Sequence, residues 1–405
     1  MADAGARRAA AECIEAAADP LVGLSHRIHG HPELAFAEEQ ASAWCADLLT
    51  ASGFGVEPGV SGLPTALRAS AGSGPLHIVF CAEYDALPGV GHACGHNIIC
   101  AASLGAAIGT AAIADAVGLT VTVLGTPGEE LFGLRELPPG ANGPGKAVLL
   151  ESGAFDGVHA AMMVHPAPVD LAAAASRAVT RIQARFRAAD AGNAGFLASP
   201  RALLAADQAG TLCDIAAGLL HTSAPAGLTV HRVQSAGCWD QHPEALIDFA
   251  VRGDTLGDAQ DAAGRLADCA RSAAAATGCQ VTVERFLPYA QMRHDPDLVA
   301  CYQANAQARG REFPDLGPIA DQIGYATDMG TVSHQLPAIH PFIGIETTAM
   351  NHQPEFAAAC IGPSADRALI DGAVALAWTA LDAATRPGLR HRLLTQGPAQ
   401  SVRGL

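Results

Sequence analysis

The segment His77–Asn97, HIVFCAEYDALPGVGHACGHN, joins a short apolar run to a loop crowded with polar residues. Its first part, His77–Ala82, is rich in β-branched and apolar residues and predicts a buried strand. A second such run, Leu119–Gly125 (LTVTVLG), comes after the Ala- and Ile-rich segment Asn97–Val117, which predicts a helix packed closely on a sheet. Strands that alternate with helices predict an α/β sheet, whose ligands bind beyond the carboxyl ends of the strands.

The pattern of the sequence changes at Val179. From there to Ala188, polar residues alternate with apolar ones, a period of two that is typical of a half-exposed strand. The next segments predict a helix, two strands, a helix and a strand, at Pro200–Leu220, Leu228–Val233, Ala245–Arg252, Leu256–Thr277 and Gln280–Phe286. The order β-α-β-β-α-β is that of a ferredoxin-like domain.

The α/β pattern resumes after Pro288, with a predicted strand at Ile339–Ile345 and a closing helix at Pro363–Ala384. We therefore predict an α/β protein whose larger domain, a mixed sheet flanked by helices, is formed by residues 1–178 and 289–405. A ferredoxin-like α+β domain is inserted at residues 179–288. Two domains also fit a chain of 405 residues, at roughly 100–200 residues per domain.

The composition excludes several classes of protein. With 50% hydrophobic and 16% charged residues, the chain can bury a core and is neither disordered nor collagen-like. Its 40 acidic and 24 basic residues give a net charge of -16, which argues against binding to nucleic-acid phosphates. No run of about 18 apolar residues lacks a charge or a breaker, so we predict no membrane span.

Eleven cysteines are spread through the chain without a regular spacing. Most lie in Ala- and Val-rich runs, which favours buried, reduced thiols. The N-terminal stretch contains Asp3, Glu12 and Glu15 and so lacks the uninterrupted apolar segment of a signal peptide. We therefore expect a cytoplasmic protein.

Candidate metal ligands follow the first predicted strand. Cys94 and His96 flank Gly95 in the loop, so both side chains can converge on one ion while the glycine permits a tight turn. Glu83 and Asp85 stand just upstream, where a carboxylate can orient a ligand imidazole. A Cys-x-His pair alone is weak evidence and is more often structural, so it needs support from elsewhere in the chain.

That support comes from three further segments. Glu129 and Glu130 end the sequence GTPGEE after the second predicted strand. Such a pair is often only a solvated turn, but metal-assisted hydrolysis needs one carboxylate on the metal and another to accept a proton from water. His165 (in AMMVHP) and His352 (in AMNHQPEF) are each compatible with a core histidine or with a ligand. Four such sites at predicted strand or loop ends favour a metal centre.

The chain resembles the zinc-dependent aminoacylase and carboxypeptidase-G family of metallopeptidases. Within it, the chain is most similar to the branch of IAA-amino-acid hydrolases, aminobenzoyl-glutamate hydrolases and N-acyl-amino-acid deacylases. Six segments carry the resemblance in family order: RIHGHPELAFAE (Arg27–Glu38), AEYDALPGVGHACGHN (Ala82–Asn97), GTPGEE (Gly125–Glu130), GPGKAVLLESGAFDGVHAAMMVHP (Gly143–Pro166), GYATDMGTVSH (Gly324–His334) and AMNHQPEF (Ala349–Phe356). Of these, GHACGHN is a specific signature.

The resemblance implies two divalent metal ions held by Cys94, His96, Glu130, His165 and His352. It also implies that Glu129 is the general base, that Asp85 lies behind the ligands, and that the inserted domain is a lid through which a homodimer forms. Thiolate, imidazole and carboxylate ligands suit Zn²⁺, although Mn²⁺ or Co²⁺ is accepted by similar sets. The expected reaction is hydrolysis of the amide bond in an N-acyl amino acid, a dipeptide or a related small amide.

Two positions of the inserted domain depart from the family pattern. Asp190 stands where the family places a histidine that helps to stabilise the oxyanion, and Asp240 stands where it places an asparagine. An ionised aspartate cannot donate a hydrogen bond, so the two acids suggest an unusual and basic substrate. Alternatively, the protein is an impaired or repurposed homologue that binds a small molecule or transfers acyl groups. Under an offset alignment, Asn193, His231 or His242 takes the family roles. A further alternative is that both acids are solvated surface residues outside the cleft.

Overall fold

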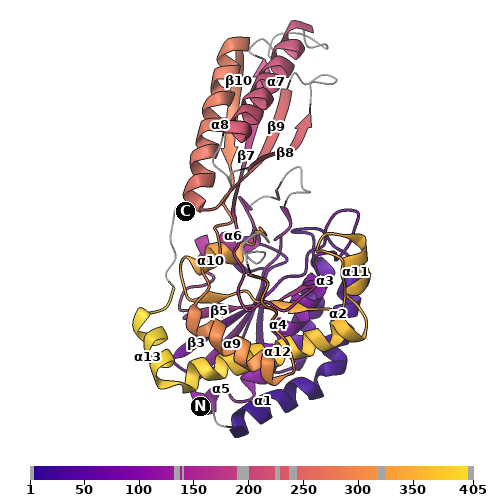
Figure 1. Cartoon of the computed structure of the whole chain (residues 1–405), viewed down its shortest axis with the longest axis vertical. Helices are drawn as coiled ribbons and strands as arrows, with labels where there is room; N and C mark the ends of the chain where they lie inside the picture. Colours follow the sequence, from indigo (N-terminus) through magenta and orange to yellow (C-terminus); the bar gives the residue numbers. More distant parts are fainter. Residues whose placement is uncertain are drawn as a thin grey trace. The chain divides into compact units, whose positions relative to one another are not determined.

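The computed structural model describes residues 4–131, 137–138, 141–188, 200–223, 229–236, 244–317 and 324–399 (Figure 1). At residues 200–206, 220–223, 230–236 and 244 it describes the backbone alone. The chain divides into two compact units. The larger unit comprises Met1–Ala175, Met292–Ile323 and Thr331–Leu405, and the smaller comprises Ser176–Gln291 and Gly324–Gly330.

A six-stranded mixed sheet with strand order β1-β2-β4-β3-β5-β11 forms the centre of the larger unit. Its strands are β1 (Gly55–Pro58), β2 (Leu67–Gly72), β3 (Leu76–Ala82), β4 (Leu119–Gly125), β5 (Ala160–Met162) and β11 (Ala338–Ile339). Strands β4, β3, β5 and β11 run parallel, while β1 and β2 pair antiparallel. The two runs predicted as strands, β3 and β4, are parallel neighbours, and Ala82 pairs with Gly125 at their carboxyl ends. The loops that follow these strands therefore leave the sheet at one edge.

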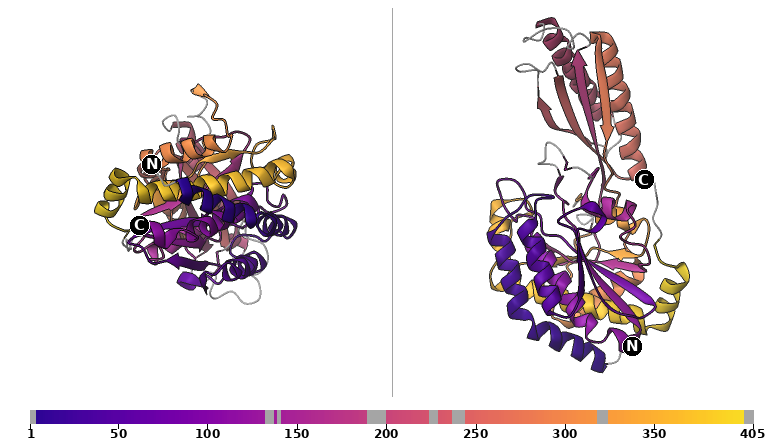
Figure 2. Two further views of the ribbon diagram at one scale, coloured as in Figure 1. Left: turned by 90° about the horizontal axis from the view of Figure 1, so that it is seen from below. Right: turned by 180° about the vertical axis from the view of Figure 1, so that it is seen from behind.

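Helices of the larger unit pack around α4 (His96–Ala111), which lies against β3 and β4. Helix α12 (Pro363–Thr385) packs on α4, and α1 (Ala4–Ala16), α2 (Ala18–Gly30) and α9 (Pro296–Ala308) contact this pair (Figure 2). Shorter or peripheral helices are α3 (Glu39–Ala51), η1 (Val60–Gly62), α5 (Ala114–Val117), α6 (Gly145–Glu151), α10 (Met329–Ser333), α11 (Pro354–Ala359) and α13 (Pro387–Gln396). Nearly all side chains of α4 are buried, which explains its small, apolar composition.

Helix α12 is long and apolar enough, by length and composition, to cross a membrane, and no other helix of the described ranges is. However, 78% of its apolar window is buried inside the protein. Its packing against α4 and α9 accounts for this apolar surface, as in the core helix of a globular fold.

Four predictions about element boundaries are wrong. The segment Ile339–Ile345 forms two short strands instead of one, because Pro341 has no N–H for the strand ladder. Strand β11 joins the large sheet, whereas β12 (Phe342–Gly344) pairs with β6 (His165–Ala167) in a separate ladder, so His165 begins a strand and does not end one. The helix predicted to Val117 breaks after Ala111, and α13 follows the helix predicted to close the fold.

The smaller unit has the element order β-α-β-β-α-β, as the sequence predicts. Its elements are β7 (Ala178–Ala188), α7 (Pro200–Ser223), β8 (Thr229–Ala236), β9 (Glu244–Gly253), α8 (Leu256–Thr277) and β10 (Cys279–Arg285). The sheet order is β10-β7-β9-β8, with every neighbouring pair antiparallel. Both helices lie on one face of this sheet, over a core that includes Ile182, Phe186 and Ile247 (Figures 1 and 2).

The opposite face of β7 is less exposed than its alternating pattern predicts. Arg181 and Gln183 are only 4% and 5% exposed. The Arg181 guanidinium donates hydrogen bonds to both carboxylate oxygens of the fully buried Asp248 on β9. It also lies 5.1 Å from the centre of the Phe286 ring. A buried, bidentate ion pair therefore replaces the expected solvent contact of this face.

The contact between α1 and α4 predicts which glycines tolerate a side chain. A Cβ atom at Gly109 would lie 2.6 Å from Ile14 Cδ1 and 2.8 Å from the Ala10 carbonyl oxygen. We expect Gly109→Ala to destabilise the protein by about 1–3 kcal/mol through overpacking, measured by urea or thermal unfolding. Gly23→Ala, at an exposed position of α2, is the control, because nothing lies within 4 Å of a Cβ atom there, and it should stabilise by up to about 1 kcal/mol. Equal effects of the two substitutions would contradict this close packing.

Candidate metal centre

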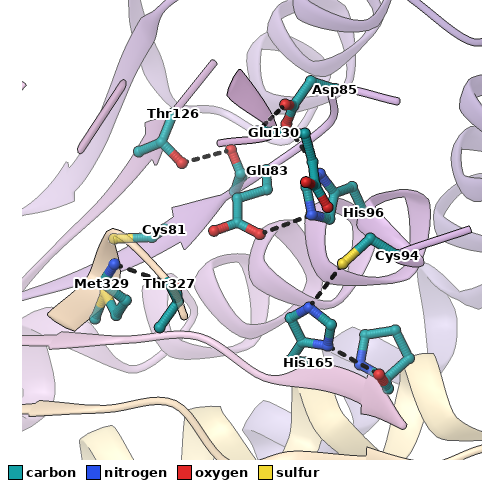
Figure 3. A network of polar contacts seen from close by, with 12 residues as sticks. Cys81, Glu83, Asp85, Cys94, His96, Thr126, Glu130, His165, Thr327 and Met329 are labelled. Atoms are coloured by element: carbon teal, nitrogen blue, oxygen red, sulfur yellow. Dashed lines mark hydrogen bonds and ion pairs between the residues drawn. The ribbon is translucent and has the colours of Figure 1, made fainter. Parts of the chain in front are cut away.

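The carboxyl ends of β3 and β4 bring four acidic side chains to one edge of the sheet. Glu83 and Asp85 follow β3, and Glu129 and Glu130 follow β4. The Thr126 N–H donates to the Ala82 carbonyl oxygen at 2.8 Å, which holds the starts of the two loops together. All four acids are at most 8% exposed. Figure 3 shows Glu83, Asp85 and Glu130 grouped around the His96 ring.

Gly95 permits the loop after β3 to pack against the segment that carries His165. Its φ is +78°, and a Cβ atom there would collide with the Pro166 side chain. With the two backbones this close, Cys94 Sγ lies 3.3 Å from His165 Nε2 (Figure 3). Zinc ligands at about 2.0 Å (nitrogen) and about 2.3 Å (sulfur) in tetrahedral geometry lie about 3.5 Å apart, so this spacing suits a shared ion.

His352 reaches the same place from the far end of the sequence. Its N–H donates to the Ala93 carbonyl oxygen at 2.8 Å, and its Nε2 lies 2.9 Å from Glu130 Oε1. The residue adopts φ = +73°, a left-handed conformation that few non-glycine residues take. A strained backbone at a predicted ligand is typical of a functional site.

Every predicted metal-site residue in the described ranges belongs to this cluster. Potential ligand atoms lie within 4.8 Å of one another in three groups: Cys94, His96 and His165; Cys94, Glu130 and His352; and His96, Glu129 and Glu130. Cys94 belongs to two of these groups. The structure thus brings together residues that are up to 258 positions apart in the chain (94 to 352).

The environment of His96 fits a metal ligand. Its Nδ1 lies 2.9 Å from Asp85 Oδ1, while its buried Nε2 makes no hydrogen bond and faces a Glu83 carboxylate oxygen at 3.4 Å. The second oxygen of Asp85 accepts a hydrogen bond from the Glu130 N–H at 2.8 Å. A carboxylate that holds one imidazole nitrogen and leaves the other to the ion is the usual arrangement around metal-binding histidines. Together with the mixed donor set, this arrangement fits a divalent cation such as Zn²⁺.

Protonation in the metal-free centre is set by burial and by the acidic cluster. Burial, with Glu130 and Glu129 adding to it, raises the pKa of the Cys94 thiol well above its usual value. Burial alone would lower the pKa of His96, but the charges of Asp85 and Glu83 outweigh it and raise that pKa to about 9. Burial lowers the pKa of His165 to about 4. Two of the candidate ligands therefore carry a proton at neutral pH that a metal must displace.

Two residues at the centre are not among those that the sequence predicts. Lys146, the only lysine of the chain, is fully buried on α6 and forms an ion pair with Glu83. The other carboxylate oxygen of Glu83 faces His96 Nε2 at 3.4 Å. A single lysine within an apolar segment was a usable signal. The ring centre of His340 lies 5.2 Å from that of His165. Its place in the sequence, after a short apolar run, is that of an ordinary core residue and does not indicate a place at the metal centre.

The two acids suspected of contacting the substrate, Asp190 and Asp240, lie outside the described residues. The same holds for Asn193, His242 and the side chain of His231. Their roles stay predictions.

Residues 79–368 match the sequence profile of Peptidase family M20/M25/M40. The chain belongs to this family. It is 32% identical to the mouse Xaa-Arg dipeptidase over 95% of the chain and 90% of that protein. It is 31% identical to the human Xaa-Arg dipeptidase, over 94% of the chain and 89% of the relative. The M20 chain is therefore a metal-binding hydrolase of amide bonds.

Solved structures agree with the fold. An aminobenzoyl-glutamate utilization protein from Klebsiella pneumoniae superposes with a TM-score of 0.66 at 18% identity, covering 92% of this chain and 98% of the other. A dinuclear metal-binding peptidase of the M20 family from Bacillus subtilis gives a TM-score of 0.59 at 21% identity, covering 91% and 98%. At such low sequence identity, these structural similarities support only the fold of the M20 chain.

Metal affinity should rise with pH. Because Cys94 and His96 must both lose a proton to bind, each released proton adds about tenfold in affinity per pH unit, or about 100-fold for two. Competition against a chelator of known affinity, between about pH 6.5 and about pH 7.5, measures this slope. Cys94→Ser is the control, since a serine releases no proton and the slope should fall to about tenfold. An affinity independent of pH would contradict the assignment of these two ligands.

Proposed function

We propose that this protein is a dipeptidase that hydrolyses the peptide bond before a basic C-terminal residue. The observation that carries the proposal is its 32% identity, over 95% of the chain and 90% of the relative, to a protein named Xaa-Arg dipeptidase. The cluster of ligand atoms around Cys94 supports the hydrolytic part, and the acids of the smaller unit's sequence support the preference for a cation.

The centre is proposed to hold two divalent ions. Two groups of three ligands share Cys94, one with His96 and His165 and the other with Glu130 and His352. Cys94, His96, Glu130, His165 and His352 would hold the ions. When bound, the ions polarise the amide carbonyl and make water a stronger acid. The donor set favours Zn²⁺, and metal analysis of protein purified without added metal tests this against Mn²⁺ and Co²⁺.

Glu129 is proposed as the general base. Its carboxylate lies within 4.8 Å of ligand atoms of His96 and Glu130, at the edge of the ligand cluster. From there it takes a proton from the attacking water and delivers it to the nitrogen of the departing amino acid, acting first as base and then as acid. Asp85 holds His96 and the Glu130 N–H in place.

Asp190 and Asp240 are proposed to contact the basic side chain of the substrate. A carboxylate paired with a guanidinium forms charge-assisted and often bidentate hydrogen bonds. Most relatives are expected to place a histidine and an asparagine at these positions, so the acids would mark a change in substrate charge.

Replacement of the base tests the mechanism. Glu129→Gln should lower kcat by about 10²- to 10⁴-fold while the bound metal stays unchanged, because the amide keeps the shape of the side chain and cannot accept the proton. The measurements are hydrolysis of alanyl-arginine and metal content. An active Glu129→Gln variant would contradict the assignment of Glu129 as the general base. A wild-type protein that binds metal but hydrolyses no dipeptide or acyl-amino acid would contradict the proposed enzymatic function.

Substrate charge is a separate test. We expect kcat/KM for alanyl-arginine to exceed that for alanyl-glutamate, and Asp190→Asn or Asp240→Asn to reduce this preference by about 10- to 100-fold, the value of one charged hydrogen bond. Wild-type activity on N-acetyl-alanine in both variants is the control for folding. A preference for arginine that neither substitution changes would place the recognition of the cation elsewhere.

A homodimer is proposed to form through the smaller unit. Leu212, Ile215 and Leu219 on α7 are 44%, 57% and 64% exposed and lie three and four residues apart, on one face of the helix. An exposed apolar stripe of this kind favours association.

Ile215→Glu should shift a dimer to monomers, because association would bury the new charge. Sedimentation velocity at several concentrations measures this, with Gln260→Glu on the exposed side of α8 as a control of equal charge. If wild-type protein sediments as a monomer, or if both variants remain dimers, α7 is not the interface.

A further inference from the structure

We propose that Glu38 is a positioning residue for Glu129, because its buried carboxylate holds the peptide that precedes the base. This inference rests on the role given to Glu129 in the proposed function and extends it to a side chain more than 90 positions away. The side-chain hydrogen bonds of Glu38 go to Phe36, Thr65 and Gly128, none of which is a predicted metal ligand.

The Glu38 carboxylate is fully buried and has three hydrogen-bond donors. Its Oε1 accepts from the N–H groups of Phe36 and Gly128, each at 2.8 Å, and its Oε2 accepts from Thr65 Oγ1 at 2.9 Å. The Gly128 bond crosses from the segment before α3 to the loop after β4. A buried carboxylate with three donors of this kind is held rigidly and makes a firm anchor for the loop.

The backbone of Gly128 is held from several sides. While its N–H donates to Glu38, its carbonyl oxygen accepts from the Gly145 N–H at 3.1 Å. Gly128 has φ = +68°, and a Cβ atom there would lie 2.5 Å from the ring of Phe36, which covers it. Phe36 itself adopts φ = +64°, a strained backbone conformation for a non-glycine residue. This conformation places its ring over Gly128 and its N–H against Glu38.

The residues on both sides of Glu129 are thus fixed by buried acids. Glu38 accepts from the N–H of Gly128, and Asp85 accepts from the N–H of Glu130 at 2.8 Å. Between these two anchors, the backbone of Glu129 has little freedom to move. Because a displacement of about 1 Å can cost about 100-fold in rate, loss of one anchor should slow the chemical step.

The anchor requires an acceptor but no negative charge. Burial, and then the charge of Asp85, raises the pKa of Glu38 to about 8. A proton on Oε2 can be donated to Thr65 Oγ1, while Oε1 continues to accept from both N–H groups. A glutamine in the same rotamer reproduces this pattern, since its oxygen accepts and its NH₂ group donates. Glu38→Gln should therefore be tolerated and Glu38→Leu should not.

The test compares Glu38→Leu with Glu38→Gln in the full-length, metal-loaded protein on alanyl-arginine. We expect Glu38→Leu to lower kcat by about 100-fold, with KM and bound metal within about twofold of wild type, and Glu38→Gln to stay within about threefold in kcat. In the Glu129→Gln background, Glu38→Leu should cause almost no further loss, because the base that it positions is already gone. A general structural role would instead reduce metal content and stability, and its effect would add to that of Glu129→Gln.

Crystal structures of the two metal-loaded variants give a readout that does not depend on turnover. Glu129 should move by about 1 Å or more in Glu38→Leu and stay in place in Glu38→Gln. An unmoved Glu129, a wild-type kcat in Glu38→Leu, or equal losses in both variants would overturn the role of Glu38. An active Glu129→Gln variant would overturn the assignment of Glu129 as the base, and a wild-type protein without turnover would overturn the proposed function; in either case the structures would still decide whether Glu38 holds this loop.

Discussion

The Asp85 carboxylate connects the three elements from which the metal centre is built. It follows β3, its Oδ1 lies 2.9 Å from Nδ1 of His96 at the start of α4, and its Oδ2 accepts from the Glu130 N–H after β4. Burial alone would raise the pKa of Asp85, but the charge and hydrogen bond of His96 outweigh it and lower that pKa. The acid therefore stays ionised in the protein interior, where loss of one partner of a buried pair costs about 3–5 kcal/mol.

The buried acids around Asp85 give the metal centre an excess of negative charge. Glu83, Asp85, Glu129 and Glu130 are all buried there, and the Cys94 thiolate would add a fifth charge. Lys146 pairs with Glu83, and His96 balances one further charge when protonated. Buried anions are stable only when paired, so the remaining charge calls for cations. Metal binding follows from the electrostatics of the fold as much as from the shape of any one ligand motif.

Much of this arrangement could be predicted from the sequence because it is local or periodic. The apolar runs that become β3 and β4 precede GHACGHN and GTPGEE, and parallel strands bring their loops to one edge. The contacts of Glu38 with Gly128 and of Lys146 with Glu83 could not be predicted in this way, because they join segments separated by 90 and 63 residues. Likewise, the burial of Arg181 depends on Asp248 of another strand, which the alternation within β7 does not reveal.

Close approach of backbones explains why such distant segments can share one site. Gly95 lies against Pro166 and so brings the Cys94 loop to His165, while Gly145 lies against the Pro127 carbonyl and so brings Lys146 to Glu83. In each pair, a side chain on the glycine would occupy the space of the neighbouring segment. The ligands can therefore act only after these loops have packed. The backbone packing therefore sets the geometry of the ligands. Glu38 and Asp85 then hold the loop after β4, which carries both the ligand Glu130 and the proposed base Glu129.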